Sequence, residues 1–301
     1  MNWNCDQIPD LRGKISIVTG GNTGIGFETV KALAEKNAKV VLACRNQDKG
    51  TAALAKIRSA QPDADVSIEI LDLASQKSVH AFGARINEQL PHIDILINNA
   101  GVMEMPLTFT EDGFEGHFAT NVLGHFTLTG LLLPLLNKAP AANRARVVTL
   151  SSAGHWIGKL DFDNLNAEKG FQRTLTYAGS KLANLVFAYE LQRRLVKNGM
   201  RTESLGAHPG VTHSDLGRNK LFTRIYLGLF GQSTADGALP SLRAAADPDV
   251  HGGDYLGPGG FMTFIGPPTV QKSRKLARDP ELGRRLWDAM QKMTGLSYLY
   301  L

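Results

Sequence analysis

The amino-acid sequence predicts an α/β protein with a doubly wound parallel sheet and helices on both faces. Short apolar runs rich in β-branched residues alternate with longer segments that carry apolar residues at helical spacing. Runs such as KVVLA and IDILI are almost continuously apolar, which is typical of strands buried from both sides. No linker, repeat or low-complexity tract divides the chain, so we expect a single domain over residues 1–301.

Six strand segments alternate with five helical segments along the chain. The strand segments are ISIVTG from residue 15, KVVLACR from 39, VSIEILD from 66, IDILINNAG from 93, RVVTLSS from 146 and RTESLGAHPG from 201. The helical segments between them are 24–36, 47–60, 75–90, 113–137 and 176–198. A further helix is expected over about 279–295, because Pro280 suits a first turn and apolar residues follow on one face.

Two stretches, 155–175 and about 212–260, carry neither pattern. Ligands of an open α/β sheet bind beyond the carboxyl ends of its strands, where long loops form the substrate pocket. We therefore expect a substrate loop or lid over about 212–260. Within it, KLFTRIYLGLFG at 220–231 is densely apolar and contains two basic residues, which fits a mobile lid, a membrane-surface helix or plain core.

Composition excludes several classes of protein. A hydrophobic content of 43% suits a soluble protein with a large core, and Cys5 and Cys44 alone cannot form a disulfide framework. The net charge of +5 is spread along the chain without a basic run, which disfavours nucleic-acid binding. The first residues contain no apolar segment, and the longest near-apolar run, 126–136, is too short to span a bilayer. We expect a cytoplasmic protein without a transmembrane segment.

The stretch IVTGGNTGIGFETVKAL, residues 17–33, places glycines between the first strand and the first helix. A glycine-rich turn at that point lets the backbone approach a pyrophosphate, and the helix N-terminus offers N–H groups and a partial positive charge. Gly20, Gly24 and Gly26 provide the turn. No Gly-Lys-Ser/Thr follows, so the strand, turn and helix predict a Rossmann-type dinucleotide site rather than a nucleoside triphosphate site.

The residue after the second strand indicates which nicotinamide cofactor is used. A carboxylate at this position accepts hydrogen bonds from the ribose 2′-OH, whereas a cation pairs with a 2′-phosphate. The strand ends VLACRN, which places Arg45 there. Because a guanidinium forms charge-assisted hydrogen bonds with phosphate, NADP(H) is favoured over NAD(H).

Tyr177 and Lys181 are four residues apart near the start of a helical segment, so their side chains share one face. An ammonium beside a phenol lowers the pKa of the tyrosine towards neutrality, as general acid–base catalysis requires. The pair alone is weak evidence for a catalytic site, since this spacing often arises by chance. It gains weight from Asn121, inside a helical segment, and from Ser151 and Ser152, which end a strand at the carboxyl edge of the sheet.

Together these motifs resemble those of the short-chain dehydrogenase/reductase family over about residues 12–215. The resemblance rests on TGGNTGIG at 19–26, NNAG at 98–101, YAGSK at 177–181 and HPGVT at 208–212. The segments LACR, LSSAGH and YAGSKLANLVF are similar to the retinol-dehydrogenase-like branch. The cofactor-binding residues that follow are Gly20, Asn22, Thr23, Gly24, Ile25, Gly26, Arg45, Asp72, Leu73, Asn99, Ala100, Gly101, Tyr177, Lys181, Pro209, Gly210, Val211 and Thr212.

The resemblance also implies a catalytic tetrad of Asn121, Ser152, Tyr177 and Lys181, with Ser152 preferred over Ser151 because that branch uses the second serine. In reduction, Tyr177 would protonate the developing alkoxide, and Ser152 would donate a hydrogen bond to the same oxygen. Lys181 would lower the pKa of Tyr177 and hold the cofactor ribose. Asn121 would hold a water molecule that connects Lys181 to solvent.

The expected function is NADP(H)-dependent hydride transfer between nicotinamide and a lipophilic aldehyde, ketone or alcohol, with reduction favoured. A catalytically silent NADP-binding regulator is one alternative, and the complete tetrad argues against it. A protochlorophyllide-reductase-like enzyme is another. The resemblance further implies a lid at 220–231 and a homo-oligomer, either a dimer or a tetramer. His117 and His125 lack a metal-binding motif, so we expect no metal.

Overall fold

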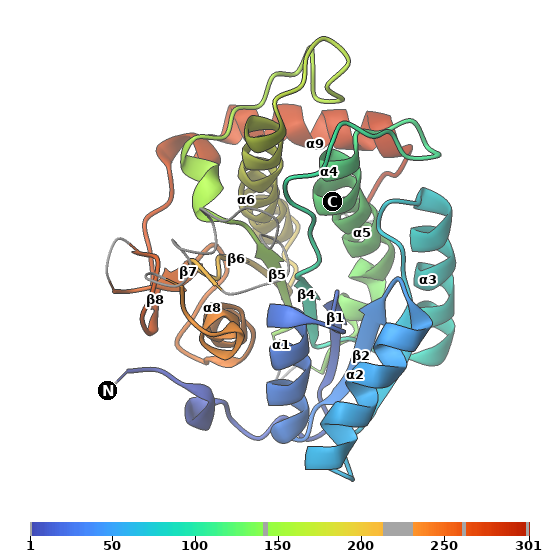
Figure 1. The fold of residues 1–301 in the computed structure, drawn as a ribbon, viewed down its shortest axis with the longest axis vertical. Coiled ribbons are helices and arrows are strands. Elements are labelled where there is room, and N and C mark those ends of the chain that lie inside the picture. Colours follow the sequence, from blue (N-terminus) through green and yellow to red (C-terminus); the bar gives the residue numbers. More distant parts are fainter. Residues whose placement is uncertain (1, 141–143, 213–230, 261–262, 299–300) are drawn as a thin grey trace.

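The computed structural model describes residues 2–140, 144–212, 231–260, 263–298 and 301. Its centre is an eight-stranded sheet in the order β3-β2-β1-β4-β5-β6-β7-β8 (Figure 1). The strands are β1 Ile15–Thr19, β2 Lys39–Cys44, β3 Val66–Ile70, β4 Ile95–Asn98, β5 Arg146–Leu150, β6 Glu203–Ala207, β7 Tyr255–Pro258 and β8 Pro268–Val270. All pairs are parallel except β7 with β8. The predicted doubly wound fold is confirmed, with an antiparallel edge strand added to it.

Helices cover both faces of the sheet (Figure 1). One face carries α1 Gly24–Glu35, α2 Gln47–Ala60 and α8 Thr234–Ala246, and the other carries α3 Gln76–Gln89, α5 Gly124–Asn137 and α6 Arg173–Lys197. Short helical turns are η1 Cys5–Gln7, α4 Gly116–Phe118, η2 Ala119–Leu123, η3 Ala153–Trp156 and η6 Lys275–Arg278. Neighbouring strand residues serve opposite cores, since Ile17 packs with α3 and α5 while Val18 packs with α1 and α8.

The strand order reverses direction at β1, which pairs with β2 on one side and with β4 on the other. The connections therefore diverge at the carboxyl ends of β1 and β4 and leave a crevice between them. In open α/β sheets this switch point is where ligands bind. Thr19 ends β1 and Asn98 ends β4, so the glycine-rich turn and the NNAG segment both begin at this crevice.

The helical segment predicted over 113–137 is a continuous run of α4, the π-helical turn η2 and α5. Among the described residues, only Gly116–Asn137 is long and apolar enough to cross a membrane by composition, and 83% of its most apolar 18-residue window is buried in the protein. That burial is typical of a core helix. The segment packs between α3 and α6 and contributes Phe126 and Leu132 to the core.

The region predicted as a loop or lid over about 212–260 contains regular structure. Helix α8 and strand β7 both lie within it and join the layers of the fold, so the prediction of an irregular segment was too broad. Small residues and Pro240 weaken the helical pattern of α8, so the sequence pattern does not indicate this helix. Most of the proposed lid at 220–231 lies outside the described residues.

Helix α9, Pro280–Thr294, packs across α6 and lies where a helix was expected over about 279–295. Its Trp287 forms an aromatic cluster with Phe126 of α5, Phe187 of α6 and Tyr298. The hydroxyl of Tyr298 donates to the carbonyl oxygen of Phe126 at 2.6 Å. The chain thus covers the outer surface of α5 and α6 with its own C-terminal segment (Figure 1).

Candidate active site

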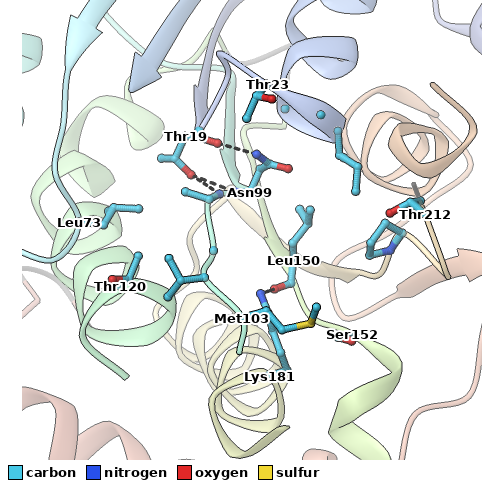
Figure 2. A pocket seen from close by; sticks show the side chains of 18 of the residues that line it. Thr19, Thr23, Leu73, Asn99, Met103, Thr120, Leu150, Ser152, Lys181 and Thr212 are labelled. Carbon is cyan, nitrogen blue, oxygen red and sulfur yellow. Dashed lines mark hydrogen bonds between the residues drawn. The ribbon is translucent and has the colours of Figure 1, made fainter. Parts of the chain in front are cut away.

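A cavity of about 530 Å³ opens at the carboxyl ends of the strands (Figure 2). All the residues predicted to bind cofactor line it: Gly20, Asn22, Thr23, Gly24, Ile25, Gly26, Arg45, Asp72, Leu73, Asn99, Ala100, Gly101, Tyr177, Lys181, Pro209, Gly210, Val211 and Thr212. Ser152 lines it as well, whereas Asn121 is not among the lining residues. Ser151, the serine not preferred as catalytic, lines it too, and the residues not anticipated are Thr19, Cys44, Leu71, Val102, Met103, Thr120 and Leu150. Most of these directly follow or end a strand, which is the signal that could have found them.

The glycine-rich turn has the geometry that its sequence predicts. Gly20 and Gly24 have φ angles of +66° and +55°, in the left-handed region that favours glycine. A Cβ atom at Gly26 would lie 2.2 Å from the carbonyl oxygen of Gly20, so no other residue fits there. Thr23 caps α1 without a side-chain hydrogen bond to the helix, which leaves the first turn of N–H groups facing the cavity.

Thr19 joins the glycine-rich turn to the segment after β4. Its hydroxyl oxygen accepts hydrogen bonds from the backbone N–H groups of Asn99 and Ala100, both at 2.9 Å. In return, Nδ2 of Asn99 donates to the carbonyl oxygen of Thr19 at 2.7 Å (Figure 2). These bonds link residues 80 and 81 positions apart and hold the two walls of the cavity in a fixed relation.

His125 connects this end of the cavity to Asn121. Its Nδ1 lies 3.1 Å from the carbonyl oxygen of Asn121, and its Nε2 lies 2.9 Å from the hydroxyl of Thr19. A carbonyl oxygen only accepts, so Nδ1 carries the proton and Nε2 of the neutral ring accepts from Thr19. Burial lowers the pKa of His125 to about 4, which keeps the ring neutral. His125 is therefore a structural link between β1 and the π-helical turn.

Asn121 lies in the π-helical turn η2, a type of distortion common at functional sites. Its Oδ1 accepts from the N–H of Val102 at 2.8 Å, and its Nδ2 donates to the Val102 carbonyl oxygen and to the hydroxyl of Ser180. The side chain thus braces the loop after β4 against α6. Both polar atoms of the side chain therefore have partners within the protein, and the main-chain carbonyl oxygen accepts from His125.

Lys181 and Tyr177 lie on one face of α6, as predicted, with Nζ 5.9 Å from the centre of the phenol ring. Nζ donates to the carbonyl oxygen of Leu150 at 3.2 Å, and burial lowers the pKa of Lys181 to about 8. The prediction that Lys181 lowers the pKa of Tyr177 is not met in this structure. Burial of the phenol raises its pKa, and a hydrogen bond with Ser152 lowers it only in part.

The two adjacent serines have different environments. Ser151 is 2% exposed, and its hydroxyl donates to the carbonyl oxygen of Lys181 at 2.7 Å. Ser152 caps the short turn η3 by accepting from the N–H of Gly154 at 3.2 Å, and it hydrogen bonds with the phenol of Tyr177. Since a catalytic hydroxyl must share the reacting oxygen with Tyr177, the geometry supports Ser152.

This difference gives a direct prediction. We expect Ser152→Ala to lower kcat/KM roughly 10²-fold, because one donor to the developing alkoxide is lost. Ser151→Ala should lower kcat/KM only a few-fold and reduce the free energy of unfolding by about 1 kcal/mol, through loss of its bond to the Lys181 carbonyl. Steady-state kinetics and urea denaturation of both variants provide the measurement. A larger kinetic loss in the Ser151 variant would reverse the assignment.

Arg45 follows β2 at the far end of the cavity, where its side chain is exposed. It makes no hydrogen bond or ion pair with any residue that the structure describes. Asp72 follows β3 nearby along the same rim, and its Oδ1 accepts from the N–H of Ala74 at 3.0 Å. This end of the cavity therefore offers one guanidinium that has no partner in the described part of the chain.

A buried pair of hydrogen-bonded side chains, His117 and Glu115, lies beside Tyr177. Nδ1 of His117 is 2.7 Å from Oε1 of Glu115, with both side chains fully buried, and the ring centres of His117 and Tyr177 are 6.3 Å apart. Burial acts to raise the pKa of Glu115, but hydrogen bonds from His117 and Phe118 outweigh it and hold the pKa below its usual value. In the described part of the chain, no three His, Cys, Asp or Glu side chains cluster as a metal site would require.

A Rossmann-type sheet with a glycine-rich turn at one end of its cavity, and a phenol, a hydroxyl and an ammonium at the other, has the parts of a nicotinamide-dependent oxidoreductase. A family model described as short chain dehydrogenase matches residues 14–223. The chain belongs to this family of oxidoreductases, as its motifs indicated.

Within the family, the chain is similar to retinol dehydrogenases. It is 40% identical to mouse (Mus musculus) retinol dehydrogenase 11, with 97% of this chain and 90% of the relative covered. It is 39% identical to human (Homo sapiens) retinol dehydrogenase 13, with 97% and 88% covered. Among solved structures, an uncharacterized protein from Mycobacterium paratuberculosis matches with a TM-score of 0.83 and 34% identity, covering 99% of this chain and 100% of that one.

Proposed function

We propose that the protein reduces a lipophilic aldehyde or ketone with NADPH, and oxidises the corresponding alcohol in reverse. One observation carries the proposal: a single cavity contains Ser152, Tyr177 and Lys181 at one end and, at the other, the guanidinium of Arg45, which has no partner among the described residues. The first three groups suit a carbonyl oxygen, and Arg45 suits a 2′-phosphate. The same cavity would thus contain both the proton donor, Tyr177, and the residue that selects NADPH over NADH, Arg45.

The residues present fit a dinucleotide. Gly26 leaves no room for a Cβ atom, and the N–H groups at the start of α1 face the cavity, so the pyrophosphate would lie at this turn. Asp72 and Leu73 would flank the adenine, and Pro209 to Thr212 would contact the nicotinamide side. When bound, the cofactor supplies the hydride that reduces the carbonyl carbon.

Three side chains would carry out the protein's part of the reaction. The phenol of Tyr177 donates its proton to the carbonyl oxygen as negative charge develops there. The hydroxyl of Ser152 donates a hydrogen bond to the same oxygen, and Lys181, on the same face of α6 as Tyr177, would hold the cofactor ribose. Because burial raises the pKa of Tyr177, the phenol is protonated near neutral pH, which suits the direction of reduction.

Two observations support a lipophilic substrate. The relatives at 39–40% identity are named for retinol, an apolar alcohol. The cavity also has apolar walls near the catalytic end, formed by Val102, Met103 and Leu150. Purified protein should oxidise NADPH in the presence of apolar aldehydes, which the loss of absorbance at 340 nm measures directly. No turnover across a panel of aliphatic, aromatic and isoprenoid carbonyls would contradict the proposal.

Cofactor choice gives a second test. We expect Arg45→Asp to raise the Kd of NADPH roughly 10- to 100-fold, because charge-assisted hydrogen bonds to the 2′-phosphate are lost. The Kd of NADH should fall, since a carboxylate accepts hydrogen bonds from the ribose hydroxyls. Titration calorimetry with both cofactors measures the change.

A matched control separates this contact from a general charge effect. Lys56 is exposed on α2 and does not line the cavity, so Lys56→Asp changes the net charge equally without touching the proposed phosphate site. Equal weakening of NADPH binding in both variants would mean that Arg45 acts only through long-range charge. Unchanged NADPH binding in the Arg45 variant would show that Arg45 does not contact the cofactor.

We also propose a homo-oligomer in the cytoplasm, as the sequence leads us to expect. Helix α9 covers the outer face of α5 and α6, so a subunit contact would use α9 itself or another surface. Light scattering measures the assembly, and cell fractionation measures the location. A monomer at micromolar concentration, or recovery with membranes, would contradict the respective proposal.

A further inference from the structure

Ser152 lies where the chain leaves β5 and enters the turn η3 (Figure 2). The hydrogen-bond ladder between β5 and β6 ends one residue earlier, since the N–H of Ser151 still donates to the carbonyl oxygen of Ala207 at 2.7 Å. Ser152 is thus the first residue beyond the ladder, and its position depends on the hydrogen bonds of its own atoms. A displacement of about 1 Å at a reacting group can cost most of its effect, so these bonds matter for the reaction.

His155 binds Ser152 through both its ring and its backbone. Its Nδ1 lies 2.7 Å from the carbonyl oxygen of Ser152, and its backbone N–H donates to the same oxygen at 3.0 Å. A carbonyl oxygen only accepts, so Nδ1 carries the proton. Nε2 of the neutral ring then faces the backbone N–H of Arg274, 3.5 Å away. Burial lowers the pKa of His155 and so maintains the neutral form.

The ring of His155 is in turn held by strand β7. It packs edge-to-face on the ring of Tyr255, with the ring centres 5.4 Å apart, and the Tyr255 hydroxyl lies 3.4 Å from Nδ1. Tyr255 stacks on His208 from its other neighbour in the sheet, β6, at 5.3 Å. His155 and Tyr255 are only 1% and 2% exposed. The ring therefore connects the packed interior of the sheet to the carbonyl of Ser152.

We propose that His155 is a positioning residue, which keeps the hydroxyl of Ser152 aligned with the phenol of Tyr177 through the hydrogen bond from its ring to the Ser152 carbonyl oxygen. The inference rests on the proposed reductase function and deepens it, because Ser152 is the second donor to the substrate oxygen in that function. His155 does not line the cavity, so it acts through Ser152 and takes no part in proton transfer.

Two amide side chains distinguish the two nitrogens of the ring. Asparagine places a donor where Nδ1 lies, whereas glutamine reaches the position of Nε2 and leaves the Ser152 carbonyl without a side-chain donor. We expect His155→Gln to lower kcat about 10-fold for the fastest substrate of the carbonyl panel, and to keep the Kd of NADPH within about twofold of the wild type. His155→Asn should keep kcat within about threefold. Steady-state kinetics and titration calorimetry measure both quantities.

A double-mutant cycle shows whether the loss passes through Ser152. If His155 acts by placing the Ser152 hydroxyl, His155→Gln has no further effect on kcat once Ser152→Ala has removed that hydroxyl. A general perturbation of the fold would lower kcat by the same factor in both backgrounds, and that result would overturn the inference. An unchanged kcat in His155→Gln, or an equal loss in His155→Asn, would also overturn it. His155→Phe, which keeps a ring against Tyr255 and has no donor, takes the place of His155→Gln if that variant does not fold.

A measurement without turnover separates the inference from the proposed function. Because Ser152 hydrogen bonds with the phenol of Tyr177, the ¹³Cζ resonance of Tyr177 reports where the Ser152 hydroxyl lies. Tyr177→Phe assigns this resonance by its loss. We expect His155→Gln to move it in the same direction as Ser152→Ala, and His155→Asn to leave it near the wild-type position. If the wild type reduces no carbonyl compound, the proposed function fails, and the resonance alone decides the inference: an unmoved resonance in His155→Gln overturns it.

Discussion

Tyr177→Phe should lower kcat for carbonyl reduction about 10³-fold while leaving the Kd of NADPH nearly unchanged. The substitution removes the proton donor and keeps the ring that packs against His117, so the loss falls on the chemical step. Lys181 and Ser152 remain to bind and orient the carbonyl, which is why some turnover should persist. Single-turnover kinetics at 340 nm, with cofactor binding measured by fluorescence, separate the two effects.

Tyr189→Phe provides the control on the same helix. Its hydroxyl lies 2.8 Å from that of Ser273 in a buried position, twelve residues beyond Tyr177. Removal of this hydroxyl should reduce the free energy of unfolding by about 1 kcal/mol and leave kcat unaltered. If Tyr177→Phe also kept kcat within about tenfold of the wild type, Tyr177 could not be the proton donor, and another acid would have to be sought in the cavity.

The second large effect is on stability in mild acid. Burial lowers the pKa of both His125 and His208 to about 4 in the folded protein, below the value of 6.5 for an exposed histidine. The unfolded chain therefore binds more protons than the folded chain between pH 6.5 and 4. The stability that the neutral rings provide is complete above pH 6.5 and is lost as the pH falls towards 4, by about 3 kcal/mol for each ring.

Urea denaturation at pH 7.5, 6.0 and 5.0 measures this loss. The slope of the free energy of unfolding against pH should be smaller in His208→Gln, by the amount that corresponds to about one bound proton, because that ring is no longer present to take up a proton on unfolding. His80→Gln, an exposed position on α3, is the matched control and should retain the full slope. A wild-type slope near zero over this interval would show that neither ring is held neutral. A slope in His208→Gln equal to that of the wild type would show that His208 does not contribute to the pH dependence of stability.

The parts of the fold and site that the sequence predicted depend on local patterns. Continuous apolar runs reveal β1 and β2 because both faces of each strand are buried, and Gly20 and Gly24 stand out because the turn needs positive φ angles. Tyr177 and Lys181 share a helix face through their spacing alone. Each of these signals is complete within a few residues.

Other parts depend on contacts that no local pattern contains. The bond between Thr19 and His125 joins residues 106 positions apart, so neither looks functional by itself. Strand β8 has only three residues, too few for a periodic pattern, and α8 is rich in small residues with a proline inside. The pKa of Tyr177 was predicted to fall because the spacing shows Lys181 but does not show how strongly the surrounding protein desolvates the phenol.

The C-terminal cover of the helical layer has a consequence for synthesis on the ribosome. Phe126 and Phe187 are made well before Trp287 and Tyr298, which pack on them in the finished protein. Until the last residues emerge, the nascent chain exposes an aromatic surface that is fully buried later. Domains fold largely from the N-terminus during translation, and exposed apolar surface promotes aggregation at this stage. The solubility of the nascent chain should therefore depend on how quickly its C-terminal segment is synthesised and packs onto α5 and α6.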